Sequence, residues 1–307
     1  MNEKVSVLQV DNLSVSFSMY NKGLSKRDLE VIHQLSIDVK KGEIVAVVGS
    51  SGSGKSLLAH AIMGILPENS KTKGSIKYYN DELNEKYLRK VRGKDIAFIP
   101  QSVDFLDPLM KVGKQVVGIN GNKERQKEVF KKYNLDDKVA EMYPFQLSGG
   151  MARRVLIATA VMNEAKLIIA DEPTPGLNLE LAMETLNNFR EIADSGCGVL
   201  LITHDVDLAL NVVDRIAVFY SGTIVEIAQV EDFIKGKDAL RHPYSKAFID
   251  ALPQNKFKEL PGYQPYAGNL PKGCLFRDRC SLKTDECCME IKMRKVRDGE
   301  VRCINAT

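Results

Sequence analysis

The sequence contains the stretch Gly49-Ser50-Ser51-Gly52-Ser53-Gly54-Lys55-Ser56, which matches the pattern G-x-x-x-x-G-K-S. An apolar run over 44–48 precedes it and predicts a strand, and the apolar spacing over 55–66 predicts a buried helix. A phosphate-binding loop requires this context, which a merely flexible Gly/Ser loop does not. Its backbone N–H groups and the helix N-terminus face the phosphates, Lys55 neutralises their charge, and the Ser56 hydroxyl can ligate Mg²⁺. The stretch therefore predicts a site for nucleotide phosphates and Mg²⁺.

A second signal is a pair of acids at the end of an apolar run. Residues 167–170 predict a buried strand that ends in Asp171 and Glu172, where carboxylates are costly unless they have a role. Asp171 suits a Mg²⁺ ligand acting through water. Glu172 is one residue further along the chain, so its side chain points in a different direction from that of Asp171, and it suits a general base that polarises an attacking water. The alternative is that both acids only cap the next helix.

Composition places the chain among ordinary globular proteins. It has 307 residues, of which 44% are hydrophobic and 27% are charged, and a formal net charge of +3. These values exclude global disorder, and the weak net charge argues against a nucleic-acid partner. The longest apolar runs have about five or six residues, too few to span a membrane, and the N-terminus lacks the apolar core of a signal peptide. We therefore expect a cytosolic protein.

The order of predicted elements indicates an α/β protein with a helical insertion. Residues 102–160 lose strand character and show helical periodicity. A parallel βαβ pattern follows, with its helix over about 179–194. The composition shifts after about Lys235, so we predict two domains, 1–235 and 236–307. The predicted strands are short pieces within 5–48, then 74–80, 95–99, 167–170, 198–202, 215–219 and 223–227.

The segment Leu147-Ser148-Gly149-Gly150-Met151 precedes a predicted helix and would by itself be a helix N-cap with flexible glycines. Together with the phosphate-binding loop and the Asp-Glu strand, it closely resembles the nucleotide-binding subunits of ABC transporters, over residues 5–235. The resemblance implies a P-loop NTPase of the ABC ATPase fold: a RecA-like core, an antiparallel β subdomain, a helical insertion over about 102–160 and a C-terminal Cys-rich extension. It also implies that Ser148, Gly149 and Gly150 bind the γ-phosphate of ATP held by a second subunit.

Single positions extend the resemblance. Gln101 matches the glutamine that touches Mg²⁺ or water and links the site to the insertion. His204 matches the switch histidine that contacts the γ-phosphate and orients the base, although a lone strand-end histidine is more often structural. Phe17 matches the aromatic residue that stacks on adenine, with Tyr20 as the alternate and a core role for Phe17 as the other interpretation.

Two segments depart from the family pattern. Asn178 stands where the family usually has an Asp that crosses the dimer interface, so communication between the two ATP sites is expected to differ. The segment 102–108 differs from the usual Glu-Pro-rich version. Because that region faces the membrane partner in the family, the departure bears on partner choice.

The tail suggests a branch of the family. His242-Pro243-Tyr244-Ser245-Lys246-Ala247 and the later cysteines are similar to the peptide/nickel importer ATPases. That resemblance implies a peripheral protein at the cytoplasmic face of the cell membrane. It would drive uptake of oligopeptides, dipeptides, nickel or metal chelates, with two permease subunits, a second related ATPase subunit and, indirectly, an extracytoplasmic solute-binding protein. The alternatives are an exporter ATPase and a soluble ABC-type ATPase with a metal-sensing tail.

Five of the six cysteines lie in the last 34 residues. In a reducing compartment such a cluster favours a metal site over disulfides. Cys274, Cys280, Cys287 and Cys303 provide four thiolates, which can hold an iron–sulfur cluster or zinc, and Cys288 is left over. The resemblance favours [4Fe–4S]. Zinc remains the alternative, as does a loose tail without metal.

Overall fold

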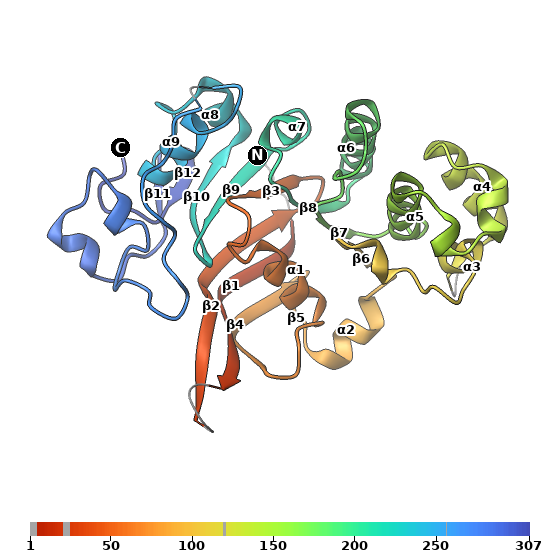
Figure 1. Cartoon of the computed structure of the whole chain (residues 1–307), viewed down its shortest axis with the longest axis horizontal. Coiled ribbons are helices and arrows are strands. Elements are labelled where there is room, and N and C mark those ends of the chain that lie inside the picture. The colour runs from red at the N-terminus through yellow and green to blue at the C-terminus, as the bar shows by residue number, and fades with distance from the viewer. Residues whose placement is uncertain (1–4, 21–24, 119–120, 256) are drawn as a thin grey trace.

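The computed structural model describes residues 5–20, 25–118, 121–255 and 257–307. In these ranges a main sheet of eight strands has the order β11-β12-β10-β9-β3-β8-β7-β6 (Figure 1). Strands β9, β3, β8, β7 and β6 run parallel to one another. The parallel strands are β3 (Ile44–Val48), β6 (Ile96–Ile99), β7 (Leu167–Asp171), β8 (Gly198–Ile202) and β9 (Arg215–Tyr220). The expected parallel βαβ unit is confirmed, because β7 and β8 are direct neighbours.

The central strands are buried on both faces, as parallel strands covered by helices are. Side chains of β3 alternate between two apolar cores: Ile44, Ala46 and Val48 lie in one, and Val45 and Val47 in the other. The first core also contains side chains of α5 (Gly149–Val161) and α6 (Leu179–Asp194). The second contains side chains of α1 (Lys55–Met63) and of a separate antiparallel sheet. The main sheet is therefore a middle layer, with α5 and α6 on one face and α1 and the antiparallel sheet on the other.

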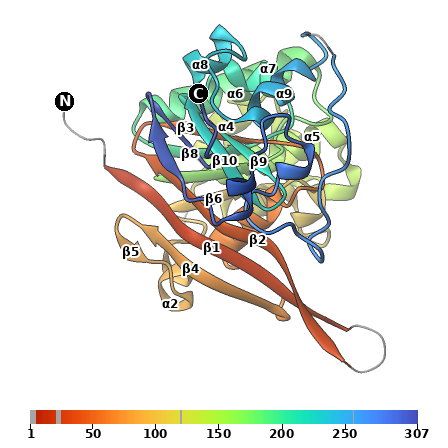
Figure 2. The ribbon, with the colours of Figure 1, turned by 90° about the vertical axis from the view of Figure 1, so that its left-hand side faces the viewer.

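The antiparallel sheet has the order β2-β1-β4-β5. Its strands are β1 (Ser6–Tyr20), β2 (Lys26–Lys40), β4 (Ser70–Tyr78) and β5 (Asp81–Glu82). The expectation of short strands here was wrong: β1 and β2 have 15 residues each and project from the body of the molecule (Figure 2). Several register shifts let the pair continue past irregular positions.

Helix α1 ends earlier than the apolar pattern suggested. The pattern extends to residue 66, but Gly64 takes a left-handed conformation, with φ of 60°, and its N–H donates to the carbonyls of the last turn. Glycine adopts this conformation without steric cost and commonly terminates helices. The helix therefore stops at Met63.

The insertion lies at the end of the molecule away from the C-terminal tail (Figure 1). It contains short 3-10 turns and the helices α3 (Val112–Val117), α4 (Lys123–Lys132) and α5. Helix α2 (Glu85–Val91) belongs to the connection before β6. The helical insertion predicted over 102–160 is therefore present in the described part of that range.

The C-terminal tail is joined to the main sheet. Strand β12 (Gly299–Val301) pairs with β10 (Thr223–Gln229), and β11 (Arg294–Val296) completes the edge. A buried ion pair between Glu226 and Arg241 fixes the chain before α9 (Pro243–Asp250), and Glu226 also accepts hydrogen bonds from the backbone N–H groups of Arg241 and His242. Short helices α7 (Val206–Leu210) and α8 (Val230–Lys235) complete the architecture. The domain boundary at 235/236 stays a prediction.

In the described ranges, no helix combines the length and the apolar character needed to cross a membrane.

Candidate functional site

The predicted nucleotide residues follow the carboxyl ends of adjacent parallel strands. The phosphate-binding loop follows β3, Gln101 follows β6, Glu172 follows β7 and His204 follows β8. Parallel strands present their carboxyl ends at one edge of a sheet, which is where open α/β sheets bind ligands. The fold thus gathers residues that are more than 150 positions apart in the sequence.

The loop 49–56 forms the expected turn into α1. A Cβ at Gly49 would lie 2.3 Å from the backbone oxygen of Phe219, so only glycine fits there. No side chain caps the N-terminus of α1, so its first N–H groups are available to an anion. Lys55 is buried, and its Nζ donates to the carbonyls of Gly49 at 2.9 Å and Ser50 at 3.0 Å. Burial lowers the pKa of Lys55, while the carboxylates of Glu172 and Asp171 oppose this shift.

Asp171 has the surroundings of a cation ligand. The residue is 1% exposed, and among the described atoms its Oδ1 has no hydrogen-bond partner. Burial raises the pKa of Asp171, and a hydrogen bond from the Ser56 hydroxyl opposes this rise. A carboxylate oxygen without a partner beside a hydroxyl is a hard-oxygen donor set, the kind that Mg²⁺ prefers. The residues therefore fit Mg²⁺.

Glu172 is held in an uncommon backbone conformation. Its φ is 48°, in the left-handed region that non-glycine residues rarely adopt. Such strain costs about 1–3 kcal/mol and concentrates at functional sites. The Glu172 carboxylate is almost buried, and its Oε2 lies 2.7 Å from Nδ1 of His204, whose side chain is 63% exposed. The histidine thus joins the carboxylate to the open side of the site.

Gln101 is exposed, and its backbone is held by a residue that the sequence analysis missed. Arg153 of α5 donates to the carbonyl of Pro100 at 2.9 Å and to that of Gln101 at 2.6 Å. The Arg153 side chain is buried, and burial lowers its pKa. This contact joins the helical insertion directly to the segment that leaves β6.

The segment Ser148-Gly149-Gly150 lies at the start of α5. Ser148 caps the helix by accepting a hydrogen bond from the N–H of Met151, and both Ser148 and Gly149 are exposed. In Figure 1, α5 lies on the insertion side and apart from α1, so the segment does not complete the phosphate loop of its own chain. Asn178 caps α6 by accepting from the N–H of Leu181 at 2.9 Å, so the capping function of an Asp is retained without its charge.

The two candidates for the adenine contact differ in their surroundings. Phe17 is half-buried and packs against the core that includes α1. Tyr20 is 70% exposed, with Nζ of Lys26 lying 5.1 Å from its ring centre. The stacking role of either residue stays a prediction.

A segment of the C-terminal tail contacts the phosphate-binding loop, which sequence patterns did not indicate. The hydroxyl of Ser50 donates to Oε1 of Gln264 at 2.9 Å. Arg279 holds this segment in place by donating to the carbonyls of Leu260 and Pro261, each at 2.9 Å. We call residues 260–265 the strap. Arg279 directly precedes Cys280, so the strap connects the cysteine-rich tail to the nucleotide site.

The four cysteines predicted as metal ligands affect one another electrostatically. Burial raises the pKa of Cys274 to about 11, and the thiols of Cys303, Cys287 and Cys280 add to the rise. Burial also raises the pKa of Cys303, and the thiols of Cys280 and Cys287 add to that rise. In the described part of the chain, no group of three or more His, Cys, Asp or Glu side chains could hold a metal ion. The arrangement therefore gives the predicted cluster no support beyond the proximity of its thiols.

Two family models match the chain. One, described as ABC transporter, matches residues 32–175, and one, described as the C-terminal region of oligopeptide/dipeptide transporters, matches residues 225–287. The chain is 33% identical to the probable D,D-dipeptide transport ATP-binding protein DdpD of Escherichia coli (strain K12), over 97% of this chain and 95% of that protein. It is 34% identical to the dipeptide transport ATP-binding protein DppD of Bacillus subtilis (strain 168), over 92% and 88%.

A solved structure agrees with the fold. The dimeric structure of MJ0796, a bacterial ABC transporter cassette, superposes with a TM-score of 0.65 and 26% identity, over 73% of this chain and 98% of that one. The ABC ATPase fold predicted from the motifs is thereby confirmed. The chain belongs to the ABC transporter family, as one of its ATP-binding subunits with ATPase activity.

Proposed function

We propose that the chain hydrolyses ATP at the cytoplasmic face of a membrane to drive the uptake of dipeptides or oligopeptides. The match of its tail to the C-terminal region of oligopeptide/dipeptide transporters carries this proposal. Similarity to dipeptide transport ATP-binding proteins along nearly the whole chain supports it. Nickel and metal chelates, which the sequence resemblance also implied, have no support among these relatives.

The geometry supports specific roles in hydrolysis. The loop amides and Lys55 bind the phosphates, and Ser56 and Asp171 hold Mg²⁺, which neutralises charge on the β- and γ-phosphates when bound. Glu172 accepts a proton from the attacking water as its oxygen bonds to the γ-phosphorus and the bond to the β–γ bridging oxygen breaks. His204 positions the Glu172 carboxylate through the 2.7 Å contact. Gln101 lies at the same strand edge, where it can contact the water or Mg²⁺.

A second ATP-binding subunit completes the site. Ser148 and Gly149 are exposed at the start of α5, with no atom within 4 Å of a Cβ built at Gly149, so the segment is open to a partner's nucleotide. The N–H groups at the start of this helix suit a γ-phosphate. The similar cassette MJ0796 is dimeric. In this chain we propose a related ATPase subunit as the partner.

The insertion supplies a surface for two permease subunits. Several large apolar side chains are exposed there, and Tyr143 and Phe145 stack with their ring centres 5.6 Å apart. Exposed apolar patches of this kind mark interaction sites. Arg153 would transmit movement of this surface to Gln101. The exposed apolar residues are Phe105, Leu109, Met110 and Phe145.

For the tail, we propose that Cys274, Cys280, Cys287 and Cys303 hold a [4Fe–4S] cluster, with Zn²⁺ as the alternative ligand. Burial first, and neighbouring thiols of the set second, raise the pKa values of Cys274, Cys280 and Cys303, which supports convergence of the thiols, whereas Cys288 is exposed. Anaerobic purification should give a brown protein with absorbance near roughly 400 nm and about four iron atoms per chain. Cys280→Ser should bleach it and the control Cys288→Ser should not. A colourless anaerobic preparation would contradict the cluster.

Uptake into proteoliposomes tests the proposed function. The assembled complex, supplied with ATP and a solute-binding protein, should accumulate a labelled dipeptide. Lys55→Ala should abolish uptake because the loop loses its phosphate-binding cation, whereas Lys258→Ala, an exposed position in the tail, should not. ATP-dependent uptake of nickel without uptake of peptides would contradict the proposal.

A further inference from the structure

Ser50, the second residue of the phosphate-binding loop, is held from two sides. Its carbonyl accepts a hydrogen bond from Nζ of Lys55 at 3.0 Å, and its hydroxyl donates to Oε1 of Gln264 in the strap at 2.9 Å. Lys55 also donates to the carbonyl of Gly49 at 2.9 Å. In the described structure Ser50 therefore links the strap to the lysine that is proposed to bind the phosphates.

The strap is fixed on both sides of Gln264. On its N-terminal side, two strap carbonyls accept hydrogen bonds from Arg279, each at 2.9 Å. On its C-terminal side, the carbonyl of Pro265 accepts from the hydroxyl of Ser221, in the turn between β9 and β10, at 3.4 Å. Because both flanks are held by residues outside the loop, the Gln264 side chain meets Ser50 with little further loss of backbone entropy.

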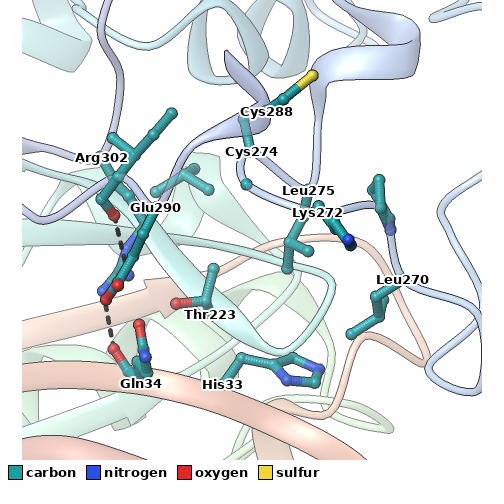
Figure 3. Close-up of a pocket in the computed structure, with 14 residues that line it drawn as sticks. His33, Gln34, Thr223, Leu270, Lys272, Cys274, Leu275, Cys288, Glu290 and Arg302 are labelled. Carbon is teal, nitrogen blue, oxygen red and sulfur yellow. Dashed lines mark hydrogen bonds between the residues drawn. The ribbon is translucent and has the colours of Figure 1, made fainter. Parts of the chain in front are cut away.

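The tail that carries the strap is anchored to both sheets. Strand β12 pairs with β10 of the main sheet, and Arg302 donates to the carbonyl of Gln34 in β2 at 2.7 Å (Figure 3). Arg279 lies with its guanidinium carbon 5.9 Å from the ring centre of Phe276 and donates to the hydroxyl of Tyr220 in β9 at 3.4 Å. These contacts fix the strap relative to the sheet that carries the phosphate-binding loop.

Tyr244 of α9 is a second neighbour of Ser50. The residue is 3% exposed, and its ring centre lies 4.4 Å from that of Tyr220 and 5.4 Å from that of Phe276. Burial raises the pKa of Tyr244, and hydrogen bonding with Ser50 opposes this rise. Tyr244, Ser50 and Gln264 border one cavity of about 500 Å³. A serine hydroxyl can donate one hydrogen bond and accept another, so both tail residues can bind it at the same time.

We propose that Gln264 and Tyr244 are positioning residues of the ATP site, which act through Ser50. Gln264 accepts from the Ser50 hydroxyl, and the buried phenol of Tyr244 holds the same serine from α9. With Ser50 fixed, the carbonyl that holds Lys55 is in place before the nucleotide binds. Preorganisation of this kind raises affinity without adding a contact to the ligand. The proposal gives the C-terminal region a part in ATP binding, and it does not depend on peptides being the transported substrate.

Titration of Mg-ATP into the isolated full chain tests the proposal. Gln264→Met keeps the length of the side chain and removes the acceptor, and Tyr244→Phe keeps the ring and removes the hydroxyl. Each variant should raise the Kd for ATP about two- to tenfold, as the loss of one hydrogen bond does. The matched control is Gln254→Met, because Gln254 also lies in the tail but contacts Asp207 of α7. This control should leave the Kd unchanged.

A double-mutant cycle with Ser50→Ala separates positioning from general destabilisation. Ser50→Ala removes the hydroxyl, so the addition of Gln264→Met should raise the Kd no further. In the assembled complex, Gln264→Met should raise the KM for ATP together with the Kd and keep turnover at saturating ATP within about twofold of the parent value. Loss of stability alone would not produce this combination.

Equal Kd values in the parent chain, Gln264→Met and Tyr244→Phe would overturn the proposal. So would additive effects of Gln264→Met and Ser50→Ala, because the glutamine would then act on another group, or an equal rise of the Kd in Gln254→Met. Thermal melting shows which variants are folded, and if Tyr244→Phe is unfolded, the cycle at Gln264 decides the outcome. A failure of peptide uptake would leave these Kd values untouched.

Discussion

Replacing Arg153 with methionine tests how the helical insertion is joined to the ATP site. The substitution keeps an unbranched side chain on α5 and removes the donors to Pro100 and Gln101. Pro100 is buried, so its carbonyl loses this side-chain donor without gaining a hydrogen bond from water. Gln101 is exposed, so its carbonyl can be hydrated.

The magnitude follows from this difference. A buried carbonyl left unpaired costs about 1–3 kcal/mol, and the hydrated one costs less. Loss of the buried guanidinium offsets part of this cost, because burial already disfavours its charge. We therefore expect the free energy of unfolding to fall by about 1–3 kcal/mol. We expect the link between Gln101 and α5 to weaken by about tenfold, or 1.4 kcal/mol.

The assay is the number of peptides imported per ATP hydrolysed by the complex in proteoliposomes. Arg153→Met should retain ATP binding and lose most of the coupling. The matched control is Arg154→Met: Arg154 donates to the carbonyls of Gly150, Tyr133 and Asn134, all within the insertion. That variant should lose stability and keep coupling. Equal coupling in Arg153→Met and the parent, or equal uncoupling in both variants, would refute the assigned role of Arg153.

Three further predictions concern other parts of the chain. Burial lowers the pKa of His242 to about 3. Between neutral pH and about pH 5 the unfolded state therefore binds a proton that the folded state does not, and the free energy of unfolding should fall by about 2 kcal/mol. Calorimetric melts of His242→Asn should show a smaller loss over the same pH range. Asn178→Asp keeps the cap of α6 and introduces the negative charge that the family usually has at this position. The free energy of unfolding should therefore change by less than about 1 kcal/mol, while the Hill coefficient for ATP hydrolysis changes. Arg279→Ala should release the strap and raise the ATP Kd about two- to tenfold in a binding titration, and an unchanged Kd would show that the strap does not support the loop.

Local patterns were sufficient to select the candidate residues for a nucleotide site. The phosphate-binding loop and the Asp171-Glu172 pair each occupy a few consecutive residues after an apolar run, so spacing alone located them. In the structure they meet at one sheet edge, because parallel strands present their carboxyl ends together. Helix α6 (Leu179–Asp194) has the bounds of its predicted range because its apolar face is regular along its whole length.

Other features depend on contacts that no local pattern carries. The left-handed backbone conformation of Glu172, with φ of 48°, cannot be predicted from the presence of an ordinary glutamate in the sequence. The bond between Ser50 and Gln264 joins positions 214 residues apart. The hydrogen bond from Arg153 to the Gln101 carbonyl depends on the packing of α5 against β6.

The structure of the C-terminal tail could also be predicted only in part from the sequence. The spacing of cysteines along the sequence identified four candidate ligands, but spacing does not set the orientation of their side chains. Nor did composition reveal that β12 would pair with β10, since a strand of three residues gives almost no periodic signal. The expected boundary near Lys235 came from a change in composition, which sheet pairing can cross.

ATP turnover by the complex carrying Glu172→Gln tests most directly whether this carboxylate is the hydrolytic base. The amide keeps the shape of the side chain but cannot take a proton from water. We predict that turnover falls by about 10²–10⁴-fold, while ATP affinity is retained and the nucleotide-bound dimer accumulates. Hydrolysis by Glu172→Gln at the parent rate would contradict the assignment, because the site would then have to obtain its base elsewhere.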